Sequence, residues 1–279
     1  MNRIQKKFEE LELKDDFMFG KVMSNKLLCK KTLEVLLGIA IEDIHYSDSQ
    51  KTIDITYEGK SIRLDFYVQD EQHTVYNAEM QQNSNNNTKI QLPKRSRYYQ
   101  SMIDLNLIEK GTPYTALNKS FIIFICTFDP FGKGLYRYTF QNLCTENPEL
   151  SLGDETTKLF FNTKGFSEDK TVSEPLKNFL YYIETKIPTD NFTNELDAEV
   201  ERIRMNETWR REYMKEILHD FDIKEEGRQE GFESGQKEGE DRLSKLLQFL
   251  MAAERSEDMN KAIMDSEYRT QLYKEFHLS

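Results

Sequence analysis

Two short runs of alternating apolar and polar residues, joined by a polar connector, constrain this chain more than any other feature. The runs occupy residues 61–68 and 75–82, and residues 69–73 connect them. Alternation with a period of two is typical of β-strands that bury one face, and a short polar connector is typical of a hairpin. The sequence therefore predicts an antiparallel β-hairpin as the centre of the fold.

The same alternation places polar side chains of both strands on one face of this hairpin. If the apolar faces match, Asp65, Glu79 and Gln81 project from the same side. Two carboxylates and an amide offer the oxygen ligands that Mg²⁺ takes, usually together with water and substrate phosphate. The alternative is an ordinary solvated face of an antiparallel sheet, which needs no ion. The residues alone leave both interpretations open.

Charge and composition exclude several classes of protein. Lys and Arg total 38 against 49 Asp and Glu, so the net charge is −11 and any nucleic-acid role requires a local basic patch. Three separated cysteines, Cys29, Cys126 and Cys144, form no zinc or disulfide pattern. No run reaches the roughly 18 apolar residues of a membrane span, and no signal-peptide core follows the N-terminus. We therefore expect a soluble cytoplasmic protein with no membrane partner.

The remaining periodicity predicts helices around a mixed sheet. Helices are expected at residues 12–37, 90–108, 173–186 and 195–222, and strands outside the hairpin at residues 53–57, 121–128, 135–143 and 158–162. The run at 121–128 is apolar throughout, so it should be the central strand. The strand at 53–57 should extend the hairpin into an antiparallel meander. This order of elements indicates an α/β fold on one mixed sheet.

A basic cluster marks the start of the helix expected at residues 90–108. Nine residues without an acid hold four cations and are followed by two tyrosines: Lys89, Lys94, Arg95, Arg97, Tyr98 and Tyr99. Such a cluster, close after a pair of carboxylates, could hold a phosphate backbone. The alternative is a solvated helix face on which the Lys and Arg stems cover apolar surface.

Near the C-terminus, glycine recurs every four residues at Gly227, Gly231, Gly235 and Gly239. Residues 222–241 carry eight acids and three bases, so this segment should not bind nucleic acid. Each helical glycine costs about 1 kcal/mol relative to alanine, yet this period keeps the glycines on one slowly slanting stripe of a helix. A flexible tether and a helix-packing surface both remain open. Residues 242–279 resume helical periodicity, and we expect a homodimer through these C-terminal helices.

Four segments together resemble the bacterial recombination-promoting nuclease family, whose members are also described as transposases of the PD-(D/E)XK nuclease superfamily. The segments are KDDFMFGKVM at residues 14–23, RLDFYV at 63–68, YNAEMQ at 76–81 and RSRYY at 95–99. The similarity covers roughly residues 11–165, and the glycine-glutamate repeat resembles that family's variable C-terminal region.

The resemblance implies an α/β fold with a restriction-endonuclease-like mixed sheet core flanked by helices, and a helical C-terminal extension. We accordingly expect a PD-(D/E)XK nuclease-like core at residues 1–170 and a helical extension at 171–221. The repeat segment and helical tail would then occupy residues 222–279.

The resemblance also implies a metal-dependent DNA endonuclease linked to recombination or transposition of mobile DNA. Asp65 and Glu79 match the two acids of the family motif and would hold Mg²⁺ (or Mn²⁺). The ion would lower the pKa of a bound water and stabilise the charge of the pentacoordinate phosphorus. Gln81 stands where the parent motif has a lysine, and its uncharged amide orients water or phosphate only by hydrogen bonds. Asp16, rather than Asp15, matches an assisting acid of the first helix.

The basic cluster supplies the expected contacts to DNA, namely Lys94, Arg95, Arg97, Tyr98 and Tyr99. The alternative function is a catalytically inactive nuclease-fold protein that acts in binding or assembly. The loss of the motif lysine at Gln81 and the net charge of −11 both permit it, because a fold alone does not establish an activity.

Overall fold

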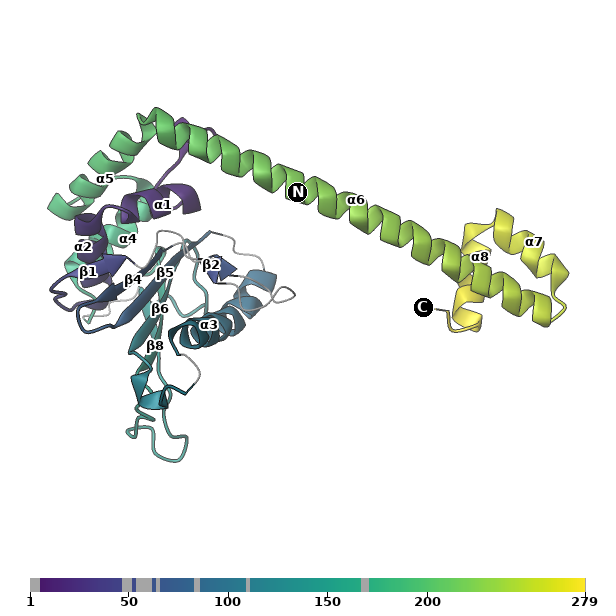
Figure 1. Ribbon diagram of the computed structural model, residues 1–279, viewed down its shortest axis with the longest axis horizontal. Helices are drawn as coiled ribbons and strands as arrows, with labels where there is room; N and C mark the ends of the chain where they lie inside the picture. Colours follow the sequence, from purple (N-terminus) through teal and green to yellow (C-terminus); the bar gives the residue numbers. More distant parts are fainter. Residues whose placement is uncertain are drawn as a thin grey trace. The chain divides into compact units, whose positions relative to one another are not determined.

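A computed structural model describes residues 6–46, 52–53, 62–63, 66–82, 86–108, 111–166 and 171–278. The chain divides into two compact units, Met1–Arg210 and Arg211–Ser279. The first unit is built on a six-stranded mixed sheet and the second is helical. Figure 1 shows the elements of both.

The sheet of the first unit has the strand order β1-β4-β5-β6-β8-β7. Its strands are β1 (Ile44–Tyr46), β4 (Phe66–Asp70), β5 (Val75–Gln81), β6 (Ser120–Cys126), β7 (Arg137–Phe140) and β8 (Thr156–Asn162). The three strands β5, β6 and β8 run parallel, and the outer pairings are antiparallel. Strand β6 lies between β5 and β8, and all its residues from Ile122 to Cys126 are buried, so the prediction of a central strand there is confirmed.

The predicted hairpin is present as β4 and β5, with Phe66 opposite Ala78 and Tyr67 opposite Asn77. The carboxylate of Asp70 stabilises the connecting turn by accepting the backbone N–H groups of Gln72 and Thr74. Residues 61 and 64–65 lie outside the described residues, and Asp65 is therefore not placed by the structure.

The meander differs from the prediction at its outer strand. Strands β2 (Thr52–Ile53) and β3 (Ile62–Arg63) pair with each other in a separate two-stranded sheet. The prediction of one hairpin strand over residues 61–68 is therefore wrong at its start, because Ile62 and Arg63 belong to that second sheet and β4 begins only at Phe66. The edge of β4 is instead taken by β1, a three-residue strand that the periodicity did not identify because it is too short to show alternation. Residues 54–57 of the expected strand lie outside the described residues.

Helices cover both faces of the sheet (Figure 1). Helix α3 (Asn86–Leu107) packs Leu92, Tyr99, Met102 and Ile103 against one face, in a core with Ile122, Phe124 and Phe160. The other side carries α1 (Asp16–Met23), α2 (Lys26–Leu37), α4 (Glu174–Thr185) and α5 (Asn191–Arg204), which pack together, and α1 contacts β5. A short 3₁₀ turn, Phe8–Glu10, precedes α1, and another, Tyr114–Ala116, precedes β6.

Local sequence explains where these helices begin and end. Asn25 caps α2 by accepting the N–H groups of Leu27 and Leu28, and Gly38 ends it in the left-handed conformation at φ 69°. The helix expected at residues 195–222 is in fact two helices, α5 and α6 (Glu207–Ala252). The break falls at Asn206, whose side chain accepts the N–H groups of Thr208 and Trp209 and so starts α6.

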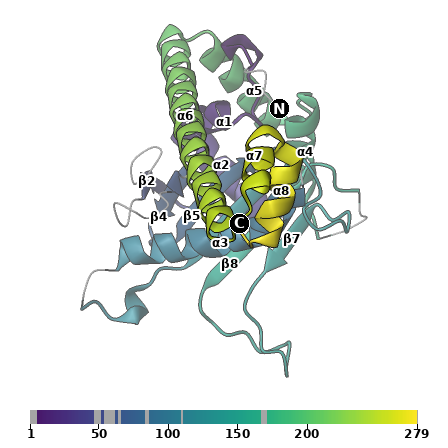
Figure 2. The same cartoon turned by 90° about the vertical axis from the view of Figure 1, so that its right-hand side faces the viewer.

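The second unit contains most of α6 followed by α7 (Ser256–Met264) and α8 (Ser266–Glu275), which lie side by side (Figure 2). Their small core is formed by Leu246, Leu250, Ala262 and Leu272. The glycine repeat is helical, and a Cβ added at any of its four glycines would meet no atom of the described chain within 4 Å. None of the helices in the described ranges is long and apolar enough to cross a membrane.

Candidate active site

Glu79 and Gln81 lie at the carboxyl end of β5, beside the parallel strand β6. In the strand register Glu79 is paired with Phe124 and Gln81 with Cys126. Ligand sites of open α/β sheets form outside the carboxyl ends of parallel strands. The local sequence thus brings an acid and an amide, two residues apart on one face, to the edge where such a sheet binds ligands.

The face that bears these side chains is buried beneath α3. Glu79 is only 1% exposed, and Asn77, two residues earlier on the same face, is also fully buried. An ordinary solvated sheet face is therefore the wrong interpretation of the polar alternation. Because burying an ionised carboxylate is costly unless it is paired, Glu79 requires a charged partner.

That partner is Arg95, which reaches down from α3. Its Nη2 forms an ion pair with Glu79 Oε2, and its Nη1 donates to Gln81 Oε1 at 2.7 Å. The remaining nitrogen, Nε, donates to the hydroxyl of Tyr99 at 2.8 Å. The guanidinium also lies over the rings of Tyr99 and Phe124, 5.1 and 5.4 Å from their centroids. One arginine therefore joins the acid and the amide of β5 to α3.

The electrostatics of the cluster follow from this geometry. Burial lowers the pKa of the Arg95 guanidinium, but the adjacent Glu79 carboxylate outweighs it and the net shift is upward. Burial and the nearby Glu79 charge both raise the pKa of the Tyr99 hydroxyl. Arg95 is thus a permanent cation, and Tyr99 remains a neutral hydroxyl at any physiological pH.

The start of α1 is held against the end of β5. Gln82, the residue after β5, donates from Nε2 to the Lys14 carbonyl at 2.7 Å and to Asp15 Oδ1 at 3.2 Å. Asp15 also accepts from Lys6 Nζ at 2.7 Å and from the Glu12 N–H at 2.8 Å. Asp16 is exposed at the first position of α1. The structure therefore gives Asp15 a structural role, and Asp16 follows it in the chain at the exposed start of α1.

The predicted DNA contacts separate into two groups. Lys94, Arg97 and Tyr98 are exposed on α3, whereas Arg95 is engaged with β5 and Tyr99 is only 6% exposed. Sequence reasoning did not identify the link from Arg95 to Glu79. Its one signal was the four-residue spacing of Arg95 and Tyr99, which places them on the same helix face. A helix cation alone does not reveal which strand it meets.

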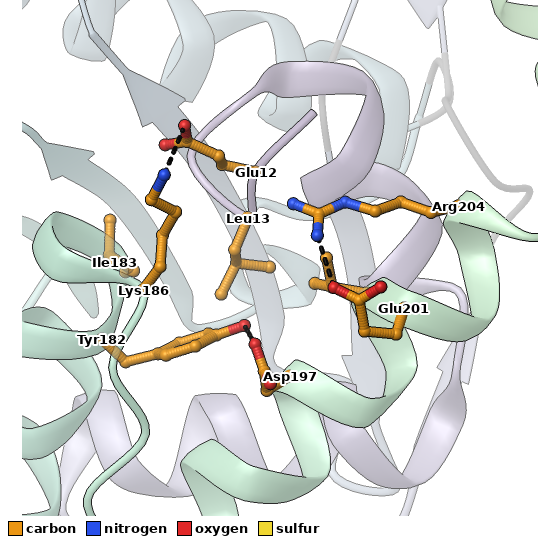
Figure 3. A pocket seen from close by; sticks show the side chains of 9 residues that line it. Glu12, Leu13, Tyr182, Ile183, Lys186, Asp197, Glu201 and Arg204 are labelled. Atoms are coloured by element: carbon orange, nitrogen blue, oxygen red, sulfur yellow. Dashed lines mark hydrogen bonds and ion pairs between the residues drawn. The ribbon is translucent and has the colours of Figure 1, made fainter. Parts of the chain in front are cut away.

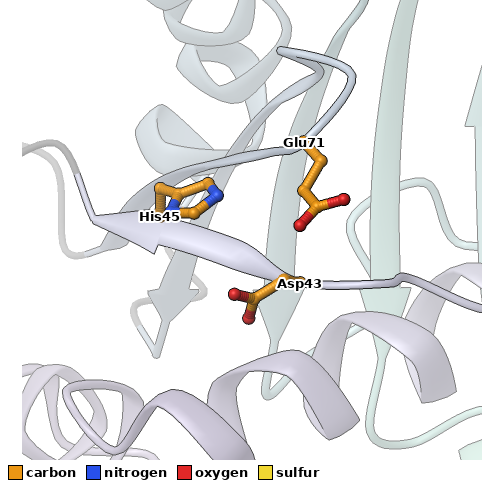
Figure 4. Close-up of side chains that lie close together, drawn as sticks. All are labelled: Asp43, His45 and Glu71. Carbon is orange, nitrogen blue, oxygen red and sulfur yellow. The ribbon is translucent and has the colours of Figure 1, made fainter.

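A second group of polar side chains lies beside β1, the outer strand of the sheet. Asp43, His45 and Glu71 have ligand atoms within 4.8 Å of one another (Figure 4). Asp43 already binds Lys26 Nζ at 2.7 Å, and this bond, with the N–H of Ile44, lowers the pKa of its carboxyl. Exposed groups of this kind are common without an ion, and the cluster lies on β1 and the hairpin turn, away from the carboxyl end of β5.

A pocket of about 170 Å³ lies between the segment before α1 and helices α4 and α5 (Figure 3). The polar side chains that line it are paired: Lys186 with Glu12 at 3.3 Å, Arg204 with Glu201 on the same helix, and the Tyr182 hydroxyl, which donates to Asp197 at 3.0 Å. Arg204 also donates to the Leu11 carbonyl at 2.6 Å. The bonds of Lys186 to Glu12 and of Arg204 to Leu11 attach the segment before α1 to helices α4 and α5, so these pocket residues have a structural role.

The first unit is thus an α/β domain with a mixed sheet, an acid-x-amide pair at the end of β5, and helix α1, which begins with an acid and contacts β5. Residues 14–226 match the PD-(D/E)XK nuclease family transposase. This match covers well over half of the chain, so the protein belongs to that family, as the four sequence segments indicated. Comparisons with curated proteins and with solved structures gave no match.

Proposed function

We propose that the protein is a cytoplasmic endonuclease that hydrolyses phosphodiester bonds of DNA with Mg²⁺ or Mn²⁺, in recombination or transposition of mobile DNA. The observation that carries the proposal is the position of Glu79 and Gln81 at the carboxyl end of β5, in a chain of a nuclease family.

Glu79 and Asp65 are the residues that we assign to the cation. The donor set is suitable, because a buried carboxylate and a second acid offer the hard oxygen ligands that Mg²⁺ and Mn²⁺ prefer. When bound, such an ion supplies Lewis acidity, which lowers the pKa of a water and offsets charge on the phosphate.

The remaining roles fall to side chains of α1, β5 and α3. Gln81 orients the phosphate or the attacking water through its amide. Asp16 assists from the exposed start of α1. Lys94, Arg97 and Tyr98 hold the DNA backbone from the exposed face of α3. Arg95 and Tyr99, expected from the sequence among the DNA contacts, act instead beneath that surface.

Cleavage of supercoiled plasmid in Mg²⁺ or Mn²⁺ tests this function. The wild type should nick or linearise the plasmid, and Asp65→Ala and Glu79→Ala should each lose about 100-fold or more of the rate. Glu149→Ala, an exposed change in the loop between β7 and β8, is the matched control. Equal cutting by all four proteins would refute the site, and no cutting of any DNA form would refute the activity.

One observation favours the alternative of an inactive binding or assembly protein. The charge of Glu79 is already balanced by Arg95, so its burial does not by itself require a metal. Calorimetry with Mn²⁺ separates the two functions, because the endonuclease should bind the ion at millimolar concentration or below and lose this binding in Glu79→Ala. Absence of any heat in the wild type would favour the alternative.

We also propose that the C-terminal helices form a homodimer contact. In the second unit α6 exposes the apolar side chains of Leu218, Phe221 and Phe232, and exposed apolar surface on one helix is typical of an interaction site. Sedimentation of the full chain should give a dimer, and Leu218→Glu with Phe221→Glu should give a monomer. A monomeric wild type would refute this contact.

A further inference from the structure

The contacts of Arg95 point to a role in the reaction that its sequence position does not reveal. We propose that Arg95 takes over the function of the lysine that Gln81 replaces in the motif. As a positioning residue, it fixes Glu79 and turns the Gln81 amide so that Nε2 faces the reacting phosphate or water. This inference rests on the proposed endonuclease function and deepens it.

The orientation of Gln81 follows from the chemistry of its partner. A guanidinium has only donors, so the atom of Gln81 that lies 2.7 Å from Arg95 Nη1 must be the carbonyl oxygen. The amide nitrogen is therefore directed away from Arg95, and its two N–H groups are donors. Gln81 is half-buried at the end of β5. A neutral amide is in this way fixed as a hydrogen-bond donor, the one function of a lysine that it can supply.

The charge of the site supports the same role. The lysine of the motif carries one positive charge, whereas Gln81, which stands in its place, carries none. The Arg95 guanidinium, which is bonded to both Glu79 and Gln81, supplies one positive charge to the same side chains. A positive charge is thus present at the end of β5, but the residue that carries it belongs to α3.

The contacts of the Arg95 guanidinium favour arginine over lysine at this position. All three of its nitrogens are used, on Glu79, Gln81 and Tyr99. Its plane also lies near two aromatic rings, those of Tyr99 and Phe124. A lysine has one nitrogen and no planar fork, so it can make only part of this set.

The test measures single-turnover cleavage of plasmid at saturating DNA, the Kd for DNA in Ca²⁺, and the thermal unfolding of each protein. The variants are Arg95→Met, Arg95→Lys, and Arg95→Met combined with Gln81→Lys. Arg202→Met is the matched control. On α5, Arg202 binds Glu199, another buried glutamate, through two nitrogens at 2.7 and 2.6 Å, so it tests the loss of an arginine from a buried acid elsewhere.

Arg95→Met should lower the rate at saturating DNA by about 100-fold, with a change of Kd below about threefold. The rate of Arg95→Lys should lie between those of the wild type and Arg95→Met. Gln81→Lys with Arg95→Met should recover at least about tenfold of the lost rate, because the cation returns at its motif position. Arg202→Met should cut at the wild-type rate. Rescue is the decisive readout, because a purely structural arginine would not be replaced by a lysine on another element.

Three results would overturn the proposal. The first is a wild-type rate in Arg95→Met, and the second is a loss that appears only in the Kd. The third is a double variant that folds but cuts no faster than Arg95→Met. If Arg95→Met does not fold, the double variant is compared with the wild type instead, and a double variant that folds but does not cut would overturn the proposal. An inactive wild type would instead refute the endonuclease function itself, together with the role of Arg95.

Discussion

Gln82 donates a hydrogen bond from its side-chain amide to the carboxylate of Asp15, with 3.2 Å between Nε2 and Oδ1. This bond joins two segments that are 67 residues apart. Together with the bond from Gln82 to the Lys14 carbonyl, it links the residues before α1 to the residue after β5. The role that we propose for Asp16 depends on this link, because Asp16 directly follows Asp15 in the chain.

Gln82→Ala should reduce cleavage more than it reduces stability. The loss of two hydrogen bonds should lower the free energy of unfolding by about 1–2 kcal/mol, while the looser α1 start should slow cutting by about tenfold. Urea unfolding and plasmid cleavage measure the two effects. Gln141→Ala, which removes a side-chain amide bonded to Thr157 at 3.3 Å in the β7–β8 pair, should leave the cutting rate intact. Equal cleavage rates of Gln82→Ala and Gln141→Ala would contradict the role of Gln82.

Glu79 and Arg95 should show strong energetic coupling. Arg95→Met leaves a buried carboxylate without its cation and should cost about 3 kcal/mol. Glu79→Ala should cost less, about 2 kcal/mol. It leaves the Arg95 cation without its partner, but 37% of the Arg95 side chain is exposed and water can hydrate it. The double variant should lose much less than the sum, with a coupling energy of about 2 kcal/mol from urea unfolding. Additive losses would mean that the ion pair contributes nothing net.

The hairpin and the family could be predicted from the sequence, because both rest on local patterns. Alternation in residues 75–82 defined β5, and the run at 121–128 defined β6 as central. The acid-x-amide spacing was enough to mark Glu79 and Gln81 as candidate site residues. What local patterns could not predict is which element covers a given face. The α3 helix buries Glu79, and the polar alternation of β5 gives no sign of this, since a solvated face has the same pattern.

Other features depended on tertiary context or on single residues. Strand β1 is a strand because it pairs with β4. Its own three residues carry no pattern that predicts this pairing. The prediction of one helix over residues 195–222 did not recognise Asn206 as the residue that caps a new helix. It therefore joined α5 and the start of α6 into a single element. The domain boundaries predicted at residues 170 and 221 remain a prediction, and the compact units of the structure meet at Arg210 and Arg211.

Asp129 should make stability depend on pH below about 4. Its carboxylate accepts the N–H groups of Phe131, Gly132 and Gly134 and the Tyr138 hydroxyl at 2.7–3.1 Å. Burial raises the pKa of Asp129, but these hydrogen bonds outweigh it and hold the pKa below its ordinary value. A depressed folded pKa means that this stabilisation is complete above the unfolded pKa of about 3.9 and is lost as the pH falls through the folded pKa.

Asp129→Asn should therefore be less stable than the wild type by about 1 kcal/mol from pH 7 to pH 5, and the difference should shrink below pH 4. Urea midpoints at pH 7, 5, 4 and 3.5 measure this. Glu149→Gln, an exposed change in the same unit, should show almost no difference at any of these values. A gap between wild type and Asp129→Asn that widened on acidification would contradict the sign of the shift.

The four glycines of α6 provide a test of what that helix is for. All four are helical and have open space where a Cβ would stand, so alanine should fit at each. Replacing Gly227, Gly231, Gly235 and Gly239 together should stabilise the helix by roughly 4 kcal/mol, about 1 kcal/mol for each position. The measurement is thermal melting of the full chain by circular dichroism, in which the second unit should melt at a higher temperature. Gly38→Ala, the same change at a residue with φ 69°, should instead lower stability in the first unit.

The quadruple variant also separates two reasons for keeping glycine there. If the glycines let a second helix approach closely, the wild type should sediment as a dimer and the alanine variant as a monomer even as its helix becomes more stable, because each methyl group would separate the backbones. If they serve only to keep α6 easily unfolded, the variant should sediment as the wild type does, and the second unit should become more resistant to proteolysis. An unchanged melting temperature would contradict both, since it would mean that α6 is not helical through the repeat in the free protein.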